Sequence, residues 1–105
     1  MTLQTLRDTL LTVTDKVYHF EANAEDEKYI VWAEDGQADT VWADGKLQQQ
    51  ATTGTIDYFT KEEFDENFDR IQKALSQADI SFGLNSIQYE DDTSLIHYEW
   101  VWEIG

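Results

Sequence analysis

Large apolar side chains recur at every second position along the segment Ser94–Ile104, and the positions between them are mixed. Because successive side chains of a strand point to opposite sides of a sheet, this alternation predicts a half-buried strand. Its apolar face carries three aromatic rings and two isoleucines, which need a cover, so we expect a helical layer over an antiparallel sheet. The side chains expected on that face are Ile96, Tyr98, Trp100, Trp102 and Ile104.

Two other segments have helical periodicity. Leu3, Leu6 and Leu10 recur at steps of three and four, which predicts a helix over residues 2–14 with Thr2 as its N-cap. Thr60-Lys61-Glu62-Glu63 has the pattern of a capping box, so we expect a second helix over residues 61–78. The apolar face expected of this second helix is Phe64, Phe68, Ile71, Leu75 and Ala78.

The remaining β-rich runs complete the predicted fold. Asp35-Gly36 and Asp44-Gly45 are typical of tight turns, and Gly83–Ser86 indicates a bulge within one strand. We expect one domain of class α+β, a two-layer sandwich with a mostly antiparallel sheet of about five strands and two helices, in the order α-β-β-β-β-α-β-β. The expected strands, besides the segment above, are 17–20, 29–33, 40–43, 55–59 and 79–90.

Two segments are expected to be loops, and both are candidates for contacts because loops carry function more often than cores do. One is the acidic stretch 21–28, and the other is the stretch 46–55, which carries no charge after its first residue. Trp32 and Trp42 precede turns and are expected to be partly exposed, as interface aromatics often are. The candidate contact residues are Glu25, Asp26, Glu27, Trp42, Asp44, Lys46, Gln48, Gln49 and Gln50.

The charge balance narrows the classes of partner. Seven Lys and Arg against 22 Asp and Glu give a formal net charge of −15, which argues against specific nucleic-acid binding and against anionic membranes. No run approaches the roughly 20 apolar residues of a membrane span. The absence of cysteine excludes disulfides and zinc–thiolate sites and favours a reducing cytosol.

Candidate chemistry is sparse. The chain contains two histidines, His19 and His97, but no G-x-S-x-G motif that would supply a serine nucleophile. We expect His97 to be a packed or surface residue. Asp35, Asp39 and Asp44 lack the spacing of an EF-hand loop, and the five glycines form no phosphate-binding loop. The sequence therefore predicts no catalytic residue, no metal site and no cofactor.

Four stretches, taken in order, resemble the tail terminator (tail-completion) proteins in the neck of long-tailed phages and prophages. None has a catalytic signature, and similar patterns occur in neighbouring neck families such as head–tail joining proteins. The stretches are the helix of Leu3, Leu6 and Leu10; Val41-Trp42-Ala43-Asp44-Gly45-Lys46; Ile56-Asp57-Tyr58-Phe59-Thr60-Lys61 with the helix after it; and residues 89–100.

The resemblance implies a virion structural protein, made in the cytoplasm of a bacterial host, whose copies form a hexameric ring on the tail tube protein and face the head–tail connector protein. Six copies would carry six times −15, or −90, formal charges, so we expect the free protein to be monomeric or weakly associated at low salt. Two other classes stay open: an acidic DNA mimic or inhibitor that binds a basic protein, and an enzyme or small-ligand carrier that uses the sheet face.

Overall fold

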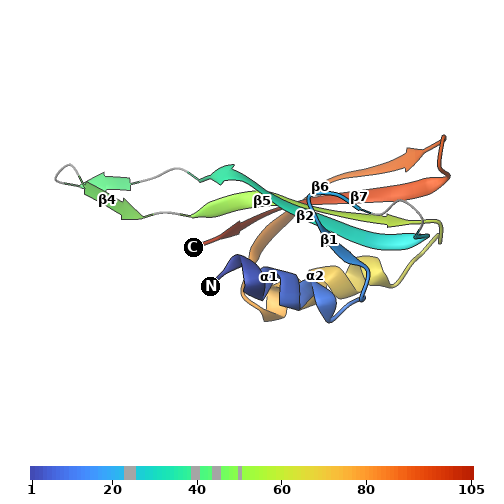
Figure 1. Ribbon diagram of the computed structural model, residues 1–105, viewed down its shortest axis with the longest axis horizontal. Coiled ribbons are helices and arrows are strands. Elements are labelled where there is room, and N and C mark those ends of the chain that lie inside the picture. The colour runs from blue at the N-terminus through green and yellow to red at the C-terminus, as the bar shows by residue number, and fades with distance from the viewer. Residues whose placement is uncertain (23–25, 39–40, 44–45, 50) are drawn as a thin grey trace.

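The computed structural model describes residues 1–22, 26–38, 41–43, 46–49 and 51–105, with the backbone alone for 41–43 and 46–49. Two helices lie on one side of a five-stranded, mostly antiparallel sheet, which confirms the predicted α+β class (Figure 1). The elements in chain order are α1 (Leu3–Leu11), β1 (Val17–His19), β2 (Lys28–Gln37), β3 (Val41–Ala43), β4 (Lys46–Gln49), β5 (Thr52–Thr60), α2 (Asn67–Gln77), β6 (Ser81–Glu90) and β7 (Leu95–Ile104).

The strand order in the large sheet is β1-β2-β5-β7-β6, so β7 lies between two antiparallel neighbours. The edge strand β1 is parallel to β2, which makes the sheet mixed. A change of register between Leu84 and Ser86 is the bulge expected in β6. The turn predicted at Asp35-Gly36 is wrong, because β2 continues through both residues to Gln37 with a bulge of its own.

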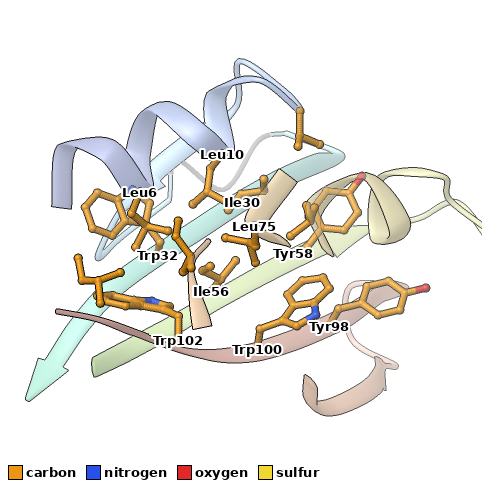
Figure 2. Packing of buried hydrophobic residues seen from close by; sticks show 14 residues of the cluster. Leu6, Leu10, Ile30, Trp32, Ile56, Tyr58, Leu75, Tyr98, Trp100 and Trp102 are labelled. Carbon is orange, nitrogen blue, oxygen red and sulfur yellow. The ribbon is translucent and has the colours of Figure 1, made fainter. Parts of the chain in front are cut away.

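The apolar face of β7 forms the centre of the core, as the alternation predicts. Trp100 is completely buried and Trp102 nearly so, and both point toward the leucines of the helices (Figure 2). The Trp100 indole N–H donates to Gln72 Oε1 of α2 at 3.1 Å, and the Trp102 N–H donates to the carbonyl of Thr55 at 2.9 Å. The indole N–H groups of both tryptophans are therefore hydrogen-bonded within the fold.

Trp32 is also part of this core, so the expectation that it is partly exposed is wrong. Only 3% of its surface is accessible, and it lies in the same buried cluster as Leu6 (Figure 2). The reason is the length of β2, which places Trp32 in mid-strand rather than next to a turn. The first helix behaves as predicted at its start, where the Thr2 hydroxyl accepts from the Thr5 N–H at 3.2 Å.

The second helix begins at Asn67, six residues later than predicted, and the proposed capping box is wrong. Thr60 is the buried last residue of β5, and its hydroxyl donates to Asp65 at 2.7 Å while accepting from the Glu62 N–H at 3.0 Å. A side chain used in this way is not free to cap a helix that starts at residue 61. Phe64 belongs to the connection, with φ of 58° and 91% of its surface exposed, and is not a core residue.

The expected loop 46–55 is also largely wrong, since it contains β4 and the start of β5. β4 pairs with β3 to form a separate two-stranded antiparallel sheet between β2 and β5 in the chain. Strand pairing uses backbone groups, so the mostly polar sequence Lys46–Gln49 can form a strand without the apolar alternation that predicts one. We call the hairpin of β3 and β4 the arm; Figure 1 shows it beyond one end of the large sheet.

Candidate assembly interface

The arm carries four of the predicted contact residues. Trp42 lies in β3, and Lys46, Gln48 and Gln49 lie in β4. Their side chains, and the predicted contacts Asp44 and Gln50, are outside the described residues. Among the described strands, β3 and β4 pair only with each other, so each has one backbone edge without a neighbour. Such edges are able to accept a further strand from another chain.

The other predicted contacts lie at the opposite end of the sheet. Asp26 and Glu27 come directly before β2, whose far end leads to the arm (Figure 1), and Glu25 is outside the described residues. Glu27 is exposed. Asp26 is held by neighbours, because it accepts a hydrogen bond from the Tyr18 hydroxyl and lies 3.9 Å from the Lys16 ammonium. The structure therefore separates the predicted site residues into two groups on a molecule 53 Å long.

A buried polar cluster lies near the Asp26 end, and the sequence did not indicate it. Asp65 Oδ2 accepts from the hydroxyls of Tyr58 at 2.6 Å and Thr60 at 2.7 Å, and Oδ1 accepts from the Asn67 N–H at 2.9 Å. The Lys28 ammonium lies 3.6 Å from Oδ2. Asp65 thus joins the end of β5, the start of β2 and the first turn of α2.

The electrostatics of this cluster favour a charged Asp65. Burial alone would raise the pKa of Asp65, but the hydrogen bonds from Tyr58, Asn67 and Thr60 and the charge of Lys28 outweigh it and hold that pKa below its usual range. Burial, and then the bond to Asp65, raise the pKa of Tyr58 strongly. Every partner of Asp65 belongs to the fold, so we assign the cluster a structural role. The available sequence signal was the position of Asp65 two residues before Asn67, where a carboxylate can accept from a backbone N–H at the start of a helix.

His97 lies on the sheet face opposite the helices, between two carboxylates. Its Nε2 is 2.6 Å from Asp57 Oδ1, its Nδ1 is 3.3 Å from Glu90 Oε1, and its ring stacks on Phe59 at 4.3 Å. The hydrogen bond to Asp57 is the main cause that raises the pKa of His97, while burial opposes it. With carboxylates at both ring nitrogens, His97 has no nitrogen directed at a hydroxyl nucleophile. The arrangement is that of an ion-pair cluster.

Other kinds of site find little support in the part of the chain that the structure describes. Within that part, no three His, Asp or Glu side chains are grouped to hold a metal ion. Neither described helix is long and apolar enough to cross a membrane. A groove of about 500 Å³ lies over the ends of β5, β6 and β7, and its lining includes the acidic residues Asp35 of β2 and Glu103 of β7.

Comparisons with known proteins leave the family open. No protein-family model matches the chain, and no curated protein matches it. Among solved structures, one from a study of the molecular mechanism of H-NOX activation matches 95% of this chain, with 11% identity and a TM-score of 0.45. This chain spans 44% of that one. A likeness at this level indicates neither a shared family nor a shared function.

Proposed function

We propose that the chain is a structural subunit of the phage neck, similar to tail terminators. Copies of it would associate into a ring, of six subunits by the resemblance, that caps the tail tube and offers a surface to the head–tail connector. The observation that carries this proposal is the arm, a two-stranded hairpin set beyond the end of the sheet that holds the core (Figure 1).

The placement of the candidate contacts supports a ring. A subunit in a closed ring meets its two neighbours with two different surfaces, whereas a simple two-fold dimer uses the same surface twice. The arm and the Asp26–Glu27 segment lie at opposite ends of a molecule with extents of 53 × 26 × 22 Å (Figure 1). An elongated subunit with one contact at each end has the shape that head-to-tail association needs.

The charge supports a position beside DNA. Nucleic-acid affinity comes mainly from Lys and Arg that neutralise phosphates, and this chain has 7 of them against 22 acidic residues. A channel lined by such subunits would let DNA pass without holding it. The same charge opposes assembly by self-repulsion, so association of the free protein should strengthen as salt screens the subunits.

The arm can be removed at a defined place. The Ala38 N–H donates to the Ala51 carbonyl at 3.0 Å, so β2 and β5 are already paired at the base of the arm. Replacing residues 39–50 by Asn-Gly would close them with a two-residue hairpin turn. We expect this variant to keep the melting temperature of the full chain but to lose salt-promoted association beyond a dimer in sedimentation velocity. When placed in the phage genome, it should give abnormally long, headless tails.

A matched control replaces residues 39–50 by a Gly/Ser linker of the same length, which tests the loss of the arm without the new turn. Both variants should behave alike. Rings in negative-stain images of either variant, or association of the full chain that is indifferent to salt, would overturn the proposal. Finished tails beside full heads would assign the chain to head–tail joining. A monomer at every salt concentration that binds a basic protein would favour the DNA-mimic alternative.

A further inference from the structure

The outer strand β6 presents an apolar row that the helices do not cover. Leu84, Ile87 and Tyr89 are 44%, 55% and 61% exposed, although they point to the same side of the sheet as the buried face of β7. Their cross-strand neighbours on β7 are Trp100, Tyr98 and Ile96. Figure 1 shows the far end of the β6–β7 hairpin well away from both helices. Side chains of this kind at a sheet edge need a partner to leave water.

Over half of its length, the outer backbone edge of β6 lacks the features that usually prevent a further strand from pairing with it. β6 ends the strand order, so its outer edge pairs with no strand among the described residues. Proteins usually protect such edges with proline, lysine or a bulge. The bulge at Leu84–Ser86 interrupts the first half, but Ser86–Glu90 pairs regularly with β7 and contains neither proline nor lysine. This second half is a template for one more strand.

The charge pattern indicates which chain supplies that strand. The protein carries −15 overall, yet the ten residues Ile80–Tyr89 carry no charge. A basic partner would be attracted to the acidic surface elsewhere rather than to this edge. A second copy of the chain is repelled by that acidic surface, and the uncharged edge is where it can approach.

We propose that Ser86–Glu90 pairs antiparallel with the same segment of a second copy, about a two-fold axis at Gln88. Residues opposite each other in an antiparallel pair lie on the same side of the sheet. In this register Ile87 faces Tyr89 of the second copy on the helix side, and Ser86 faces Glu90 of the second copy on the other side. The bulge prevents the pairing from extending past Ser86, so the register is limited to these five residues.

The same register keeps the charges apart. The two Glu90 residues are four positions apart along the paired strands, about 14 Å, whereas the screening length at physiological salt is about 8 Å. The hairpin turns with Asp91 and Asp92 project at opposite ends of the pair. Both helix layers stay on one side of the joined sheet, and Ile87 and Tyr89 of the two copies form one apolar strip between them.

This contact does not depend on the ring proposed above, because a two-fold pairing is not the rotational contact of a ring. The chain contains no cysteine, so single cysteines report contacts without background. Gln88→Cys places two thiols across the axis, where the separation of paired backbones suits a disulfide. Ser81→Cys is the matched control, since it lies on the same strand and the same sheet face but before the bulge.

Under mild oxidation in moderate salt, we expect Gln88→Cys to form a disulfide-linked dimer in most chains and Ser81→Cys to form little. We expect Ile87→Lys, which changes an exposed residue and should preserve the circular dichroism spectrum, to weaken dimerisation at least tenfold in sedimentation velocity. Equal crosslinking at both positions, an unmodified chain that never dimerises, or an Ile87→Lys variant that dimerises as strongly as the unmodified chain would each overturn the proposal. Rings that form while Gln88→Cys fails to crosslink would overturn this contact alone.

Discussion

The neighbouring strands β7 and β6 share a hairpin and a sheet, but they differ in what covers them. On the helix side, Trp100 and Trp102 of β7 are buried under α1 and α2, whereas Ile87 and Tyr89 of β6 are more than half exposed. The helices form a layer over β2, β5 and β7, and of β6 only Phe82 packs against that core. The same apolar face of the sheet is therefore buried on β7 and exposed on β6, because the helices cover β7 but not most of β6.

The largest expected effect compares one residue from each strand. Trp100→Ala should lower the free energy of unfolding by about 3–5 kcal/mol, because it empties a fully packed position. Ile87→Ala should cost less than about 0.5 kcal/mol, as exposed positions usually do. Urea unfolding at protein concentrations low enough to keep the chain monomeric measures both. Similar losses for the two variants would show that β6 is covered in solution.

A second, smaller effect concerns the buried polar cluster around Asp65. Asp65→Asn should cost about 2 kcal/mol at neutral pH, since it weakens hydrogen bonds to a buried charged group. The pKa of Asp65 is lowered in the folded state, so its stabilisation is present above the unfolded pKa of about 4 and is lost as the pH falls below it. The difference in free energy of unfolding between the unmodified protein and Asp65→Asn, measured by urea unfolding, should therefore become smaller in acid.

The control for that prediction is Glu62→Gln, which changes the exposed partner of Lys28. It should cost less than about 0.5 kcal/mol, because exposed ion pairs contribute little. A loss as large as that of Asp65→Asn would mean that the charge of Lys28, rather than the burial of Asp65, determines the stability of this region.

The smallest effect concerns the sheet face that no helix covers. The pKa of His97 is raised in the folded state, so its stabilisation is present below the unfolded pKa of about 6.5 and is lost as the pH rises through the folded value. His97→Gln should thus cost more in mild acid than in mild alkali, by less than about 1 kcal/mol. In an NMR titration of the imidazole, Asp57→Asn should lower the pKa of His97. An unchanged pKa would show that Asp57 is not the main cause of the raised value.

The sequence predicts the secondary structure correctly where a segment carries a single pattern, such as strand alternation. The alternation of Ser94–Ile104 correctly predicts the face of β7, because strand geometry fixes it. The start of α2 was predicted wrongly because two signals compete at Thr60, whose hydroxyl could cap a helix but is buried at the end of a strand. Phe64 matches the helical spacing by coincidence.

Periodicity also says which side chains share a face but not which strands are neighbours. The pairing of segments that are distant in the chain places β7 between β5 and β6. It also leaves β6 with an edge that pairs with no other described strand. For the same reason the candidate contact residues could be named from the sequence, whereas their separation to opposite ends of the sheet could not. The uncharged run Ile80–Tyr89 was the available signal for the edge.

The central position of β7 has a consequence for biosynthesis. β5 pairs with β7 from Thr52 with Ile104 to Thr60 with Ile96, so the paired residues are separated by 52 (104 − 52) to 36 (96 − 60) positions in the chain. Until β7 leaves the ribosome, the helices have only part of a sheet to pack on, and such long-range pairing is slow. The arm needs only its own local pairing and can form much earlier. The local pairing of the arm is therefore complete in sequence before β5 is made, whereas the large sheet can close only after β7 is made.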